Sequence, residues 1–128
     1  MYETAAVDRR ALQEVRQLLR MLRRPFLLEQ NRLARALRQA YDAADPLAAV
    51  MCALRESFYG SPAFGEIYRE IVERCDVRAE STKRAAFAMH MSVRTFFRFR
   101  KEAITLVATT VSRKLHALEA PRMDARAS

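Results

Sequence analysis

Residues 82–101, TKRAAFAMHMSVRTFFRFRK, contain the pattern that decides the fold of this chain. A short run with an apolar stripe ends at Met89, and an uninterrupted, arginine-rich run follows Ser92. Apolar residues at helical spacing on both sides of so short a break indicate two helices joined by a tight turn. We therefore expect a helix, a turn and a second helix here.

The residues of the turn agree with this expectation. His90 lies at the corner, which usually needs a residue with positive φ; this is most often Gly, and His is one of the few other residues enriched there. Ser92 is the expected N-cap, because its hydroxyl can accept a hydrogen bond from the backbone N–H of Arg94 or Thr95. The second helix should then begin at Val93.

The second helix has two contrasting faces. Residues with helical spacing predict a buried face, namely Phe96, Phe99, Ala103, Ile104 and Val107. The opposite face carries Val93, Arg94, Phe97, Arg98 and Lys101. This division suits a helix that reads base edges in the DNA major groove. Arg94 or Arg98 could bond O6 and N7 of a guanine together, and Thr95 is better placed to bind a phosphate.

Residues 85–108, AAFAMHMSVRTFFRFRKEAITLVA, resemble the helix-turn-helix superfamily, in the form found in region four of sigma factors and related bacterial regulators. The match rests on the small residue Ala86, on Met89 in place of the usual Leu, on Met91 at the inward turn position, and on Ser92, Thr95, Phe96, Phe97 and Arg98, which follow the Ser-x-x-Thr-apolar-Tyr-Arg pattern. His90 in place of Gly, and Arg100 where many relatives have Leu, depart from the pattern.

Two further segments, RRPFLLEQNRLARALR at 23–38 and CDVRAEST at 75–82, resemble an N-terminal module of some bacterial multidomain regulators. Both resemblances imply a DNA-binding head that acts in transcription regulation, with double-stranded DNA as its partner. Further domains after Ser128 and RNA polymerase are possible additional partners. The predicted DNA-binding residues are Lys83, Arg84, Ser92, Val93, Arg94, Thr95, Phe97, Arg98, Arg100 and Lys101, in which Lys83, Arg84 and Arg100 hold the DNA backbone.

Composition predicts one all-α domain. The chain has 128 residues, of which 51% are hydrophobic and only two are Gly and four Pro. We expect a compact bundle of about six helices with a C-terminal helix-turn-helix and a long last helix. Residues 1–80 should pack on 81–118 as a single domain, 1–120, and 121–128 should form a flexible tail.

Start and stop signals place four helices before the motif. Thr4 is a candidate cap for a first helix that ends at Arg24-Pro25. A short Phe26-Leu27-Leu28 segment follows, and Asn31 is a candidate cap for a second helix to Tyr41. Asp45-Pro46 and Ser61-Pro62 are cap-and-proline starts for a third helix to Phe58 and a fourth that ends near Cys75.

The helix that begins after Ser92 should be unusually long, because no Gly or Pro follows before Pro121. It should continue to about Leu118, with an apolar stripe formed by Ile104, Val107, Val111, Leu115 and Leu118. Two roles for this stripe remain open: self-association into a homodimer, which would space two reading helices along DNA, or packing onto the first helix of the same chain.

Charge is uneven along the chain, whose total is +8. Residues 1–41 hold nine Arg against four acids, residues 42–80 four Arg against eight acids, and residues 81–128 ten basic residues against three acids. Two basic ends suggest two surfaces that could face phosphate, with the acidic middle turned away or toward a partner. Ordinary solvation of arginine-rich helices is the alternative.

The sequence offers little for catalysis, since its two His residues accompany no Gly-rich phosphate loop, no spaced metal ligands and no nucleophile with a base. We expect no enzyme, cofactor or metal site, and a cytoplasmic protein without a membrane span. Cys52 and Cys75 fit reduced thiols in helices. Two alternatives to DNA binding remain: an interaction adaptor whose basic face meets an acidic protein, and an effector or toxin-related helical protein.

Overall fold

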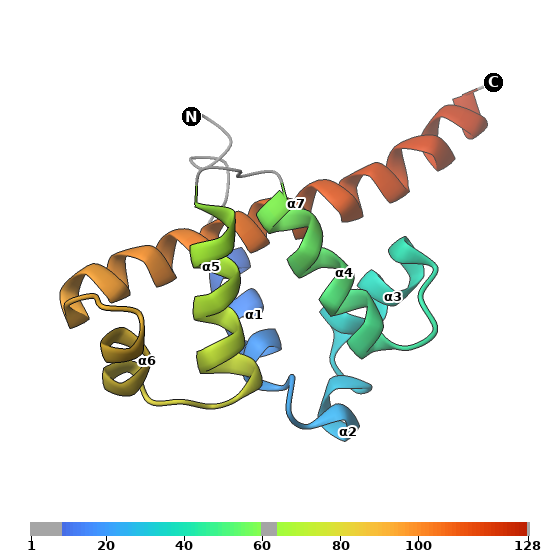
Figure 1. The fold of residues 1–128 in the computed structure, drawn as a ribbon. Coiled ribbons are helices and arrows are strands. Elements are labelled where there is room, and N and C mark those ends of the chain that lie inside the picture. The colour runs from blue at the N-terminus through green and yellow to red at the C-terminus, as the bar shows by residue number, and fades with distance from the viewer. Residues whose placement is uncertain (1–8, 60–63, 128) are drawn as a thin grey trace.

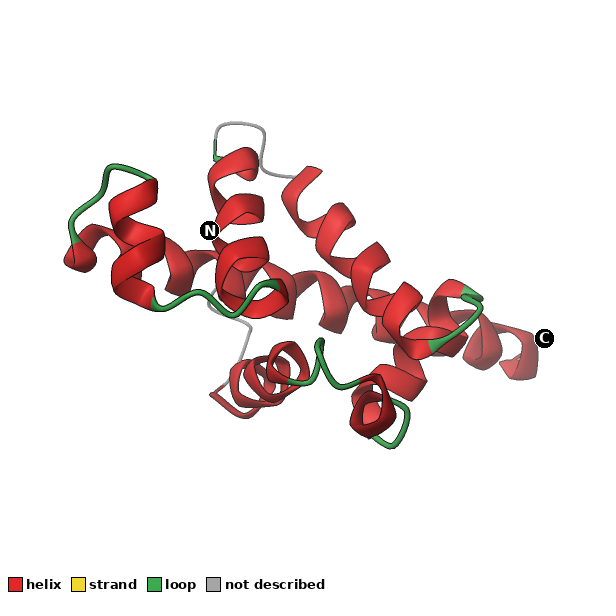
Figure 2. Cartoon of the chain, turned by 60° about the horizontal axis from the view of Figure 1, so that its bottom comes forward, coloured by secondary structure: helices red, strands yellow, loops and turns green. Residues whose placement is uncertain are grey.

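The computed structural model describes residues 9–59 and 64–127, and every regular element in these ranges is helical. The elements are α1 (Arg9–Arg20), α2 (Pro25–Leu28), α3 (Arg32–Tyr41), α4 (Pro46–Tyr59), α5 (Gly65–Val72), a π-helical segment (Glu73–Val77), α6 (Thr82–Ala88) and α7 (Val93–Ala127). The all-α class with a long last helix is confirmed, and Figures 1 and 2 show the bundle from two sides.

Two of the predicted helix starts are confirmed by hydrogen bonds. The side chain of Asn31 accepts from the backbone N–H of Ala34, and that of Asp45 accepts from the backbone N–H of Ala48 at 2.8 Å. Thr4 and the Ser61-Pro62 start lie outside the described residues. The fourth helix does not end near Cys75 as an α-helix, because α5 gives way after Val72 to the π-helical segment.

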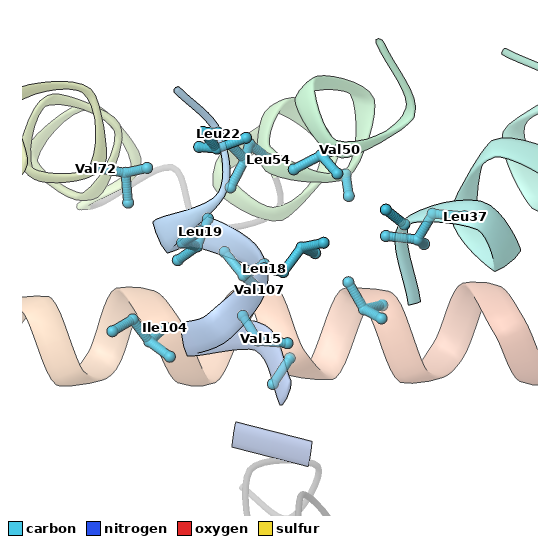
Figure 3. Packing of buried hydrophobic residues seen from close by; sticks show 14 of the residues in the cluster. Val15, Leu18, Leu19, Leu22, Leu37, Val50, Leu54, Val72, Ile104 and Val107 are labelled. Atoms are coloured by element: carbon cyan, nitrogen blue, oxygen red, sulfur yellow. The ribbon is translucent and has the colours of Figure 1, made fainter. Parts of the chain in front are cut away.

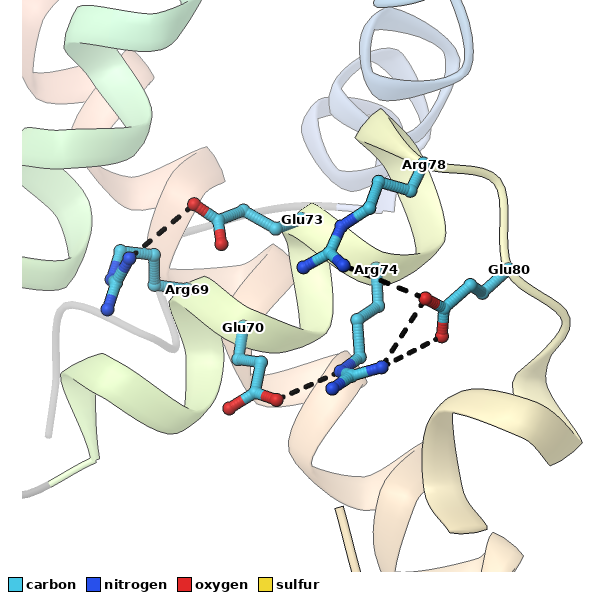
Figure 4. Close-up of polar contacts among 6 residues, drawn as sticks. All are labelled: Arg69, Glu70, Glu73, Arg74, Arg78 and Glu80. Carbon is cyan, nitrogen blue, oxygen red and sulfur yellow. Dashed lines mark hydrogen bonds and ion pairs between the residues drawn. The ribbon is translucent and has the colours of Figure 1, made fainter. Parts of the chain in front are cut away.

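The acidic middle of the chain is partly neutralised from within. Arg74 bonds Glu70 at 2.9 Å and Glu80 at 3.1 Å, and Arg78 lies 3.9 Å from Glu80 (Figure 4). These side chains connect α5 and the π-helical segment to the irregular link that leads into α6. Because these pairs are partly exposed, they contribute little to stability, and their main effect is to fix the path of the link.

The core lies where α7 crosses the other helices. Val15, Leu18 and Leu19 of α1 share one buried cluster with Ile104 and Val107 of α7 (Figure 3). The same cluster includes residues of α3, α4 and α5, such as Leu37, Val50, Leu54 and Val72. Ile104, Val107 and Val111 of the predicted apolar stripe are therefore buried within the chain, and Leu115 packs against the same cluster.

The last helix is longer than the sequence predicted. It continues past Leu118 to Ala127 and includes Pro121, so residues 121–127, which we expected to form a tail, are helical. Figure 1 shows this end of α7 extending beyond the bundle, while α6 and the start of α7 lie at the opposite end. In the described part of the chain, α7 included, we find no helix with the length and apolarity needed to cross a bilayer.

Candidate nucleic-acid interface

The first helix of the motif, α6, is fixed at both ends. The hydroxyl of Ser81 accepts from the backbone N–H of Arg84 at 3.2 Å, which caps the helix start. Ala85 and Ala86 are fully buried with Phe96 and Ile71 in a second, smaller core. The small side chains of the two alanines let α6 lie close to α7, which agrees with the small residue that the motif requires at Ala86.

The turn has the predicted backbone conformation. His90 has φ of 58°, and Met91 then donates its backbone N–H to the carbonyl of Ala86 at 2.9 Å. Ser92 caps α7 by accepting from the backbone N–H of Thr95 at 3.1 Å, and its hydroxyl donates to the Thr95 hydroxyl at 3.0 Å. The cap at Ser92 and the helix start at Val93 are therefore confirmed.

The two faces of the α7 start also agree with the prediction. Phe96 is fully buried, and Phe99 packs against both cores. Phe97 is 54% exposed, and Arg94, Arg98 and Lys101 are exposed beside it. We call the residues Val93, Arg94, Phe97, Arg98 and Lys101 the reading face. The guanidinium of Arg98 lies 5.4 Å from the ring centre of Phe99.

Arg100, which was predicted to hold the DNA backbone, forms an ion pair within the protein. Its two terminal nitrogens donate to the two carboxylate oxygens of Asp76 at 3.0 Å each. The Asp76 side chain is only 5% exposed. Burial lowers the pKa of Arg100, but the hydrogen bonds and charge of Asp76 outweigh it, so the pKa is raised above its usual value. Arg100 therefore holds α7 on the π-helical segment, and its charge is balanced by Asp76 within the protein.

A second polar contact joins α5 to α7. The Tyr68 hydroxyl of α5 donates to Glu102 at 2.9 Å. Burial, together with this hydrogen bond and the charge of Glu102, raises the pKa of Tyr68 to about 12. Tyr68 and Asp76 thus position the helix whose outer side carries the reading face.

The remaining predicted residues lie on α6. Lys83 and Arg84 are exposed, and neither side chain has a hydrogen-bonded partner among the described residues. Phe87 is 84% exposed on the same helix, so the N-terminal helices do not cover it. Together with Arg74 and Glu80, Arg84 and Phe87 line a shallow hollow. The structure thus leaves the cations of α6 free to meet an anion.

Two residues that sequence reasoning did not single out lie next to the reading face. Arg16 and Arg20 of α1 line a hollow together with Phe97 and Lys101 of α7. Their spacing of four residues places both on the polar side of α1, which could have been noticed in the sequence. Their position beside α7 depends on how α1 crosses that helix, which local patterns do not specify.

Comparisons with protein-family models, with curated proteins and with solved structures returned no match to this chain.

Proposed function

We propose that this protein binds double-stranded DNA in a sequence-specific manner and acts as a bacterial transcription regulator, with α6 and α7 as its helix-turn-helix. The observation that carries the proposal is the start of α7. A capped helix follows a positive-φ corner, one side is held in a core by Phe96, and the other side presents Arg94, Arg98 and Lys101 to solvent.

Each part of this arrangement has a function in DNA recognition. The exposed arginines can make bidentate hydrogen bonds to guanine in the major groove, and Phe97 can contact a thymine methyl group. Free N–H groups at the start of α7, the Thr95 hydroxyl, and Lys83 and Arg84 are suited to phosphates, which position the protein without reading sequence.

The reading face is tested with Arg98→Ala on a site selected from random DNA. Loss of one bidentate contact should lower affinity by roughly 1–3 kcal/mol and relax the preference at one base pair. Arg98 is exposed, so the free energy of unfolding should change little. Fluorescence anisotropy on the selected duplex and on single-base variants measures both effects. If Arg98→Ala binds the selected duplex as tightly as wild type, our assignment of the reading face is wrong.

Lys83→Ala is the matched variant for a phosphate contact. It should weaken binding to all duplexes alike and reduce the slope of log Kd against log salt by about one. A base preference altered by Lys83→Ala would contradict its assignment to the DNA backbone.

An interaction adaptor is the second candidate, and the exposure of Phe87 is the observation that favours it. A phenylalanine that is 84% exposed beside Arg84 suits a contact with an apolar and acidic protein surface. A random-sequence duplex titrated at about 50 and 200 mM salt separates the two functions, because several phosphate contacts make affinity fall by orders of magnitude over that range. An adaptor should bind the duplex weakly at both concentrations.

A further inference from the structure

A hollow between α1 and α7 adjoins the reading face. It has a volume of about 430 Å³ and is lined by Arg16, Arg20, Phe97, Arg100, Lys101 and Ile104. Both terminal nitrogens of Arg100 donate to Asp76, which balances its charge. The lining cations without such a carboxylate partner are Arg16, Arg20 and Lys101. All three are exposed, and no carboxylate in the described part of the chain forms an ion pair with them. No acidic side chain lines the hollow.

Unneutralised cations that converge on one concave surface attract an anion strongly, because the potentials of the separate charges add there. We propose that this hollow binds a phosphate of the DNA backbone, so that α1 holds the strand that borders the groove read by α7. The inference rests on the proposed function and extends its contact surface to a helix outside the helix-turn-helix.

The position of the hollow along α7 agrees with a site at the edge of the groove. Lys101 follows Arg94 by seven residues, which is about 10 Å along a helix axis. The major groove is about 12 Å wide. With the turn that carries Arg94 inside the groove, Lys101 and the neighbouring α1 cations lie near its edge, where the phosphates run.

A free phosphate compound is the other source of the same chemistry. The shared wall of the hollow favours DNA, because Phe97 and Lys101 belong both to the hollow and to the reading face. An occupant of one surface is therefore in contact with the other. Val15, Leu18 and Leu19 fill the side of α1 that faces the core, so the hollow does not continue into the core there.

The test compares two double variants that each remove two exposed arginines. Arg16→Gln/Arg20→Gln empties the hollow of its α1 charges. Arg32→Gln/Arg35→Gln makes the same change of charge on α3, which lies away from α6 and the start of α7 (Figure 1). For wild type and both variants, log Kd is measured against log salt on the selected duplex and on a random one. Ethylation interference on the selected duplex then maps the phosphates that are contacted.

The expected result is specific to the α1 variant. Its salt slope should fall by about one, since one phosphate contact contributes roughly 0.9, and the preference between duplexes should be unchanged. Interference at phosphates on one groove edge should disappear. The α3 variant should match wild type. If the two variants have equal salt slopes, and the affinity of wild type depends steeply on salt, the inference is overturned. The proposed function then remains intact.

Two other outcomes are distinguishable from this one. A wild-type protein with neither salt dependence nor sequence preference contradicts the proposed function itself. Inorganic tripolyphosphate is titrated without DNA as a probe for a free phosphate compound. If wild type binds it at micromolar concentration, and the α1 variant loses that binding while keeping the wild-type salt slope on DNA, the hollow serves a free anion and our inference is wrong.

Discussion

At the scale of single residues, the pairing of Asp76 with Arg100 has the most consequences. Arg100 lies between Phe99 and Lys101 in the sequence, and its guanidinium forms a partly buried ion pair with Asp76. Two parallel hydrogen bonds fix direction as well as distance. The pair therefore sets the rotation of α7 about its axis, and with it the direction in which Phe97 and Lys101 point.

Arg100→Met should destabilise the fold, because it leaves the Asp76 carboxylate buried without a partner. Removal of one member of a buried pair costs about 3–5 kcal/mol, and the partial exposure of Arg100 places the expected loss near the lower value. Urea unfolding measures it. In the double variant Asp76→Asn/Arg100→Met the loss should be smaller than the sum of the single losses. Additive losses would mean that the two side chains do not act as a pair.

At the scale of elements, local signals predicted the turn and the caps well. Ser92, Asn31 and Asp45 form the predicted caps because a cap needs only a side-chain acceptor and a helix that follows it. His90 has the predicted positive φ. Ala79 also has a positive φ of 60° in the link before α6, and no feature of its sequence indicates this. The neighbouring Glu80 bonds Arg74 through both its backbone N–H and its carboxylate.

The residues that were missed or misassigned all depend on long-range contacts. Asp76 reaches Arg100 across 24 positions of sequence, and Arg16 meets Lys101 only because α1 crosses α7. Helical periodicity gives the face on which a residue lies but not the element that this face meets. The candidate site was therefore predictable where it is a short motif and was not where it is formed by two separate helices.

The corner residue provides a test at this scale. His90→Val should destabilise the fold by about 1–2 kcal/mol, because a β-branched residue is strained at a φ of 58°. His90→Gly should differ from wild type by less than about 1 kcal/mol, since relief of strain is offset by greater freedom of the unfolded chain. Urea unfolding of the three proteins gives both values. If valine is tolerated as well as glycine, the corner does not require a left-handed conformation.

At the scale of the whole molecule, α7 joins two cores. The larger core holds α1 and α7 together, and the smaller one holds the helix-turn-helix through Ile71 and Phe96. Phe99 packs against both, with its ring centre 6.1 Å from that of Tyr68. Ile71 and Val72 are neighbours on α5 but belong to different cores. α7 is thus continuous with the bundle, and α6 should unfold together with it.

Phe96→Ala tests this coupling. Truncation of a fully buried phenylalanine should cost about 3–5 kcal/mol, against less than about 0.5 kcal/mol for Phe97→Ala on the exposed side of the same turn. Native-state hydrogen exchange reports the loss element by element. In a single cooperative unit, the most protected amides of α1 should lose the same free energy as those of α6, although Phe96 contacts only the smaller core. Loss of protection confined to α6 and the first turns of α7 would show instead that the helix-turn-helix opens independently, and DNA affinity would then depend on that local equilibrium and not on the stability of the bundle.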